Sequence, residues 1–162
     1  MKTAIELWRI VSRKGLTPLP KTTVSTWADE YRILSSTSAE PGRWKTSRAP
    51  YQEEIMNAFT QPGIRRVVVM SSSQVGKSDV MNNVIGRFAH LDPCAIMMIQ
   101  PTIEMAQDYS KTRISPMIRD TKVLSRIFYD VKDGAQQNTS KTRDGNNTIL
   151  SKIFPGGRLI MC

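Results

Sequence analysis

Residues 71–78 read Ser-Ser-Ser-Gln-Val-Gly-Lys-Ser and follow the phosphate-binding loop pattern G-x-x-x-x-G-K-[S/T] at all but one defined position. The departure is Ser71, which occupies the place of the first glycine. The preceding segment, 66–70, is apolar like a buried β-strand, and the following segment, 79–88, has the spacing of an amphipathic helix. Strand, loop and helix in this order are the setting that such a loop requires. The sequence therefore predicts a phosphate-binding loop, and the alternative is a serine-rich turn that contains Gly-Lys-Ser by chance.

The pattern assigns a chemical role to each part of the loop. Its backbone N–H groups and the N-terminus of the following helix would point toward a triphosphate. Lys77 would contact the β- and γ-phosphates and stabilise their charge, and the Ser78 hydroxyl would bind Mg²⁺. The expected loop residues are Ser71, Ser72, Ser73, Gln74, Val75, Gly76, Lys77 and Ser78.

The composition is that of a globular chain with a polyanionic partner. Of the 162 residues, 40% are hydrophobic, which suffices for one domain with a core and excludes a disordered chain. The formal net charge of +9 favours a partner such as nucleic acid. The two cysteines lack metal-ligand spacing and indicate a reducing compartment, with neither a disulfide nor a zinc site. No run of about 18 apolar residues is present, so neither a transmembrane helix nor a membrane partner is expected.

Apolar spacing and turn residues divide the chain into expected elements. The apolar stretch 94–99 is a second expected strand, and its connection through helix 79–88 implies a parallel sheet with a right-handed crossover. The other expected elements are helices over 1–14, 24–34 and 51–59, helical segments beginning after Thr102, at Ser115-Pro116 and at Thr121, a polar loop over 133–147, and a β-hairpin over 148–161.

These elements predict an α/β fold of the P-loop NTPase (RecA/ASCE-like) type, with a mostly parallel sheet that is incomplete within the chain. The proline-containing linker and the serine-rich loop favour a division into two parts. A small helical arm would occupy residues 1–45, and the N-terminal part of the nucleotide-hydrolase domain, ending in the hairpin, would occupy 46–162.

One part of a nucleotide-hydrolysing site is not recognisable in the sequence. Phosphoryl transfer needs a carboxylate that holds Mg²⁺ and a group that orients the attacking water. Such groups usually follow a later apolar strand, and neither Asp92 nor Asp130 has that context. We therefore expect an N-terminal piece of a longer protein, which by itself hydrolyses nucleotide poorly or not at all.

Several segments, taken in order, resemble the large terminase subunit of lambda-type tailed phages, the ATP-driven DNA-packaging motor. The resemblance spans about residues 22–162, and the ordered set is far more specific than the loop alone. The family's acidic Mg²⁺ motif, coupling motif and C-terminal nuclease domain are not among the 162 residues. The segments that resemble the family, besides the loop, are 24–32, 41–44, 49–52, 99–102, 113–118 and 154–157.

The resemblance implies cofactors, partners and further site residues. ATP and Mg²⁺ are the implied cofactors, and Gln52, beside Tyr51, resembles the glutamine that recognises adenine in related motors; the alternative for Gln52 is a surface residue that faces water. The full-length family couples ATP hydrolysis to translocation of double-stranded DNA and carries an endonuclease. The implied partners are the small terminase subunit, the portal protein and duplex DNA, in the host bacterial cytoplasm, and a homo-oligomeric motor is possible. Related motors often carry a basic residue early in the loop; serines stand there in this chain, so that role is unassigned.

Two sets of residues have two interpretations each. Four basic residues that follow the second strand could bind DNA phosphates or form a solvated helix face. Three aromatic residues near the N-terminus could anchor the small subunit or pack on the chain's own core. The basic residues are Lys111, Arg113, Arg119 and Lys122, and the aromatic residues are Trp8, Trp27 and Tyr31.

Two other functions compete with a terminase motor. Segment 100–107 also resembles the helicase segment that contacts the DNA backbone, so a helicase-like DNA translocase is one alternative. The other is an inactive prophage remnant that acts only as a binding module.

Overall fold

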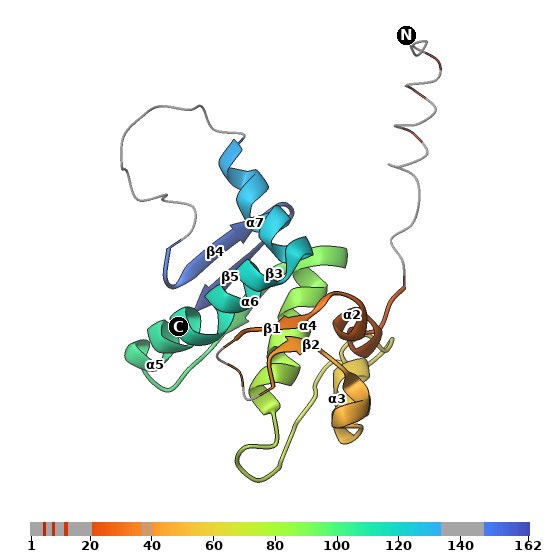
Figure 1. Cartoon of the computed structure of the whole chain (residues 1–162), viewed down its shortest axis with the longest axis vertical. Helices are drawn as coiled ribbons and strands as arrows, with labels where there is room; N and C mark the ends of the chain where they lie inside the picture. The colour runs from red at the N-terminus through yellow and green to blue at the C-terminus, as the bar shows by residue number, and fades with distance from the viewer. Residues whose placement is uncertain are drawn as a thin grey trace.

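The computed structural model describes Ile5, Trp8, Ser12 and residues 21–36, 38, 40–133 and 148–162, and for 129–133 it describes the backbone alone. The helix expected over 1–14 and the loop expected over 133–147 lie almost wholly outside these residues. The elements, labelled in Figure 1 where there is room, are α2 (Val24–Tyr31), β1 (Ile33–Leu34), β2 (Gly42–Arg43), the 3₁₀-helix η1 (Thr46–Arg48), α3 (Tyr51–Ala58), α4 (Lys77–Leu91), β3 (Ala95–Met98), α5 (Ile103–Tyr109), the π-helix η2 (Ser110–Ile114), α6 (Ser115–Asp120), α7 (Lys122–Asp133), β4 (Ser151–Phe154) and β5 (Gly157–Met161).

The larger sheet contains three strands in the order β3-β5-β4. Strand β3 runs parallel to β5, with Ile96 opposite Leu159, and β4 runs antiparallel to β5. The expected hairpin is therefore confirmed, and its turn places Gly156 at a φ of 81°, which favours glycine. Helix α7 covers this sheet, where the rings of Phe128 and Phe154 meet edge to face with centroids 5.3 Å apart. The result is a mixed α/β fold with one parallel strand pair.

The prediction of a β-strand over residues 66–70 is wrong. Residues 64–70 have no regular secondary structure, and the side chains of Val68 and Met70 are 80% and 97% exposed. An extended segment becomes a strand only when a neighbour accepts its backbone hydrogen bonds. Among the described residues, β5 is the strand that pairs with β3, and the segment 66–70 pairs with neither. The apolar composition of this segment was therefore not enough to predict a strand, because composition does not show whether a pairing partner is available.

Helix α4 is the central element of the fold and contacts α2, α3 and α7 (Figure 1). It covers the predicted helix 79–88 and extends it at both ends. Val80, Val84 and Ile85 from the predicted apolar face are buried, whereas Met81 is 39% exposed. Polar residues of α4 are buried as well, which the apolar spacing did not predict.

Helix α2 packs directly on α4 through Trp27, which has no exposed surface. The side chain lies over Gly86, where an added Cβ would overlap the indole ring. The Trp27 Nε1–H donates to Nδ1 of His90 over 3.0 Å. Of the two interpretations of Trp27, packing on the chain's own core is therefore the one that the structure supports. Tyr31 is half-buried beside the same histidine, and Trp8 is 71% exposed.

The expected helix break at Ser115-Pro116 is instead a change of helix type. Helix α5 begins at the predicted place, where the Thr102 Oγ1 accepts from the Met105 N–H, and it continues through η2 into α6 without leaving helical geometry. Pro116 has no N–H to donate to the residue four positions earlier, Thr112. The π-helix, a rare feature that occurs mostly as a single turn within α-helices, lies directly before this proline-containing turn.

Replacing Gly86 by alanine is expected to destabilise the fold, because the new methyl group would overlap the buried Trp27 ring. Overpacking of this kind costs about 1–3 kcal/mol of unfolding free energy. Urea denaturation of Gly86→Ala measures the effect, with Glu53→Ala on the exposed face of α3 as the control. Equal stability of Gly86→Ala and the unaltered chain would show that α2 does not pack there.

The stability of the fold is expected to fall as the pH drops below the ordinary histidine pKa of 6.5. Burial lowers the pKa of His90, with Glu30 opposing the shift, so the unfolded chain takes up the proton first. Protonation also removes the lone pair that accepts from Trp27. Thermal melts between pH 7.5 and 5.5 measure the loss. His90→Gln keeps an acceptor that does not titrate, and an equally steep pH dependence in this variant would contradict the prediction.

Candidate nucleotide-binding site

The predicted phosphate loop lies between the irregular segment 64–70 and the N-terminus of α4. Gly76 caps the helix in the left-handed conformation, with φ 78° and ψ 20°. A side chain at this position would be strained by that φ and would overlap the amide nitrogen of Gln52. The glycine therefore lets the loop approach α3 closely enough to be held by it.

Lys77 and Ser78 form the first turn of α4, and both side chains are exposed. The Lys77 ammonium donates to the carbonyl oxygens of Ser71 and Ser72 at 3.1 and 3.0 Å. The Lys77 side chain thus folds back toward the start of its own loop. The carbonyls it contacts are neutral acceptors, which a phosphate can replace as a stronger, charged partner.

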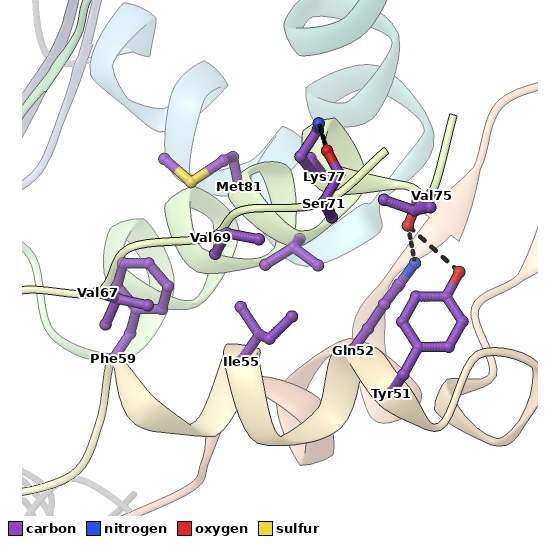
Figure 2. Close-up of a pocket in the computed structure, with 11 residues that line it drawn as sticks. Tyr51, Gln52, Ile55, Phe59, Val67, Val69, Ser71, Val75, Lys77 and Met81 are labelled. Carbon is purple, nitrogen blue, oxygen red and sulfur yellow. Dashed lines mark hydrogen bonds between the residues drawn. The ribbon is translucent and has the colours of Figure 1, made fainter. Parts of the chain in front are cut away.

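Two side chains at the start of α3 donate to one carbonyl of the loop (Figure 2). The Gln52 Nε2 and the Tyr51 hydroxyl lie 2.9 and 3.3 Å from the Val75 oxygen. Gln52 is only 5% exposed, so the interpretation of this residue as a surface glutamine facing water is wrong. Its Oε1 is buried and has no hydrogen-bond partner. A buried acceptor without a partner is costly, and this atom can take a donor from a ligand.

A cavity of about 410 Å³ lies between α3, the segment 67–71 and α4 (Figure 2). Gln52 and Lys77 are among its polar residues. A mostly apolar cavity with a few polar groups is the usual form of a small-molecule site. Its remaining lining consists of Tyr51, Ile55, Phe59, Val67, Val69, Ser71, Val75, Val80 and Met81.

A second, more polar cavity of about 960 Å³ opens at Ser78, the one residue of α4 in its lining. Lys111 and Arg113 of the π-helix line it, together with Tyr109. The structure thus brings together two of the four basic residues that the sequence associated with DNA. The other two do not line this cavity: Arg119 pairs with Asp120, at 2.7 Å, and lowers the pKa of that carboxyl, and Lys122 begins α7.

Arg32 is a buried cation beneath the first turn of α4, and the sequence analysis missed its role. Its Nε donates to the Asn83 Oδ1 over 3.2 Å, and its Nη1 donates to the Ile33 carbonyl over 2.8 Å. Its Nη2 lies 3.9 Å from the Asp79 carboxylate. Burial lowers the pKa of the guanidinium, and the charge of Asp79 opposes that shift. The only sequence signal was a basic residue at the end of an otherwise apolar helix face.

The described residues contain no group of three or more His, Cys, Asp or Glu side chains arranged to hold a metal ion. A single hydroxyl such as that of Ser78 is nevertheless compatible with Mg²⁺, which takes most of its ligands from phosphates and water. In the part of the chain that the structure describes, no helix has the length and apolar character needed to cross a bilayer.

Comparison with known protein families identifies one family that matches most of the chain. The family described as "Phage terminase large subunit gpA, ATPase domain" matches residues 38–162, and the chain therefore belongs to this family. The resemblance found from the ordered sequence segments is thereby confirmed.

Two large terminase subunits are among its relatives. That of Escherichia phage lambda is 35% identical over 146 residues, and that of Enterobacteria phage P21 is 32% identical over 146 residues. Each match covers 90% of this chain and 21% of the relative, so the chain spans about a fifth of their length. No solved structure gives a significant match.

Proposed function

We propose that this chain is the ATP-binding part of a terminase motor whose full-length form couples ATP hydrolysis to translocation of double-stranded DNA. The observation that carries the proposal is the first turn of α4, where Lys77 and Ser78 are exposed next to the left-handed Gly76. The first N–H groups of a helix have no partner within the helix and attract anions. The parallel β3–β5 pair supports a RecA/ASCE-like fold with a mostly parallel sheet for the longer protein.

Lys77 is the residue to which we assign phosphate binding and charge stabilisation. On ATP binding its ammonium would leave the Ser71 and Ser72 carbonyls for the β- and γ-phosphates. The Ser78 hydroxyl would hold Mg²⁺, which neutralises phosphate charge when bound. The N–H groups of the loop residues Ser73, Gln74 and Val75 complete the anion-binding surface that we propose.

Gln52 is the residue to which we assign recognition of adenine. Its amide nitrogen must face the Val75 carbonyl, because a carbonyl can only accept, and this orientation leaves Oε1 as an acceptor. The 6-amino group of adenine donates, whereas the corresponding oxygen of guanine accepts. The exposed ring of Tyr51, beside it, offers a surface on which a base can stack.

The partners of the longer protein are proposals that follow from its family. Lys111 and Arg113, which line the polar cavity, are the described residues that we assign to the DNA backbone, and Arg119 and Lys122 contribute less. We keep residues 1–45 as the candidate region for the small terminase subunit. Within that region Trp8 is exposed, whereas Trp27 is buried and unavailable for docking. We further propose that the longer protein binds the portal protein, forms a homo-oligomeric motor and acts in the host bacterial cytoplasm.

Lys77→Ala is expected to weaken ATP binding about 10- to 100-fold, because a phosphate-bound ammonium makes charge-assisted hydrogen bonds that alanine cannot replace. Calorimetric titration of the 162-residue chain with Mg²⁺ and ATP measures the change. The control is Lys45→Ala, which removes another exposed lysine. Binding of equal strength in Lys77→Ala and Lys45→Ala would refute the assignment of the loop.

Gln52→Ala is expected to abolish the preference of the chain for ATP over GTP, so that the two affinities become about equal. The variant lacks the acceptor that distinguishes the two bases. Titration with ATP, GTP and inorganic triphosphate separates base recognition from support of the loop. The control is Tyr51→Phe, which keeps the aromatic ring and removes only the second donor to Val75. If Gln52→Ala weakens all three ligands by the same factor, the residue holds the loop and does not recognise adenine.

A further inference from the structure

Tyr109 connects the polar cavity to the first turn of the phosphate-loop helix. It is the last residue of α5, and its hydroxyl oxygen lies 2.8 Å from the Asn82 Oδ1 and 3.2 Å from the Ser78 carbonyl oxygen. Asn82 is 1% exposed, so its oxygen is withdrawn from water and depends on a protein donor. One side chain from α5 therefore contacts two residues of α4 that are four positions apart.

The Tyr109 hydroxyl is suited to act as a permanent donor at this point. A tyrosine hydroxyl ordinarily keeps its proton at neutral pH, so it can donate here. Both neighbouring oxygens are acceptors only, and the single proton is directed at the pair. Residues four apart lie on the same face of a helix, so the hydroxyl spans one complete turn, beginning at Ser78.

We propose that Tyr109 is a positioning residue that holds the backbone of Ser78 so that its hydroxyl is in place for the Mg²⁺ of a bound nucleotide. The inference rests on the proposed function and extends it to a residue outside the loop. Ser78 and Tyr109 line the polar cavity, whereas Gln52 lines the cavity between α3 and α4. Two different elements therefore contact the backbone of the loop and its helix, α3 at Val75 and α5 at Ser78.

The position of Tyr109 itself is fixed by the next residue along the chain. The Ser110 hydroxyl donates to the Ile149 carbonyl, just before β4, and Ser110 has no exposed surface. Ser110 also begins the π-helix that carries Lys111 and Arg113 along the polar cavity. The chain is thus tied at Ser110 to the segment before β4 and at Tyr109 to α4, which is the placement that a positioning residue needs.

Tyr109→Phe removes the hydroxyl and keeps the ring, and titrations with ATP in Mg²⁺ and with ATP in EDTA test the proposal. We expect Tyr109→Phe to bind Mg²⁺–ATP about two- to tenfold more weakly than the unaltered chain, with unchanged binding in EDTA. The gain in affinity that Mg²⁺ provides should therefore shrink, as it should in Ser78→Ala. The double variant Tyr109→Phe/Ser78→Ala should bind no more weakly than Ser78→Ala alone.

The matched control is Ser125→Ala on α7, which removes a hydroxyl that donates to the Lys122 carbonyl at 3.0 Å and should leave both titrations unchanged. The double variant Tyr109→Phe/Asn82→Leu makes both members of the buried pair apolar. It restores folding if Tyr109→Phe alone is unstable. It should still lose the increase in ATP affinity that Mg²⁺ provides. An unchanged gain in a folded variant, or an equal loss with and without Mg²⁺, overturns the role of Tyr109. Failure of the unaltered chain to bind Mg²⁺–ATP refutes the proposed function itself.

Discussion

The polar residues buried along α4 determine how the other segments are arranged around this helix. Asn82 accepts from Tyr109, Asn83 accepts from Arg32, and Arg87 donates to a carbonyl of the segment that precedes α2. Each of these groups is removed from water, and an unpaired partner would cost about 1–3 kcal/mol. Hydrophobic burial is not directional, whereas a hydrogen bond requires a particular partner at a particular geometry, so these pairings restrict how the neighbouring segments can be placed. Because the helix is continuous, these contacts also fix the position of the first turn of α4.

The loop and its helix could be predicted because their signals are local. A glycine and a lysine at fixed spacing, followed by apolar residues at helical spacing, specify a loop and an amphipathic helix without reference to the rest of the chain. The β4–β5 hairpin was predictable for the same reason, since a Pro-Gly-Gly turn lies between two short apolar segments. Gln52 was chosen through a family resemblance, and its contact with the Val75 carbonyl was not anticipated.

The features that the sequence did not predict depend on distant partners. Val68 and Met70 have the composition of a strand, yet strand formation depends on which neighbour offers hydrogen bonds. Trp27 could equally be an exposed anchor or a core residue, and Gly86, 59 positions later in the chain, decides between them by leaving room for the indole. Arg32 and Tyr109 carry no motif at all. Their roles arise only when the fold places them against α4.

The contacts that hold the loop differ in whether the proposed nucleotide would have to break them. The donors to Val75 and to Ser78 lie outside the loop. In the proposed complex they would not have to move, which would lower the ordering cost of binding. In the proposed complex, the contacts of Lys77 with two loop carbonyls would be given up. Because a phosphate carries a full negative charge that a carbonyl lacks, the Coulombic attraction of the ammonium would favour that exchange. In the proposed site, a backbone held by α3 and α5 is thus combined with one lysine side chain that would change partners when a triphosphate binds.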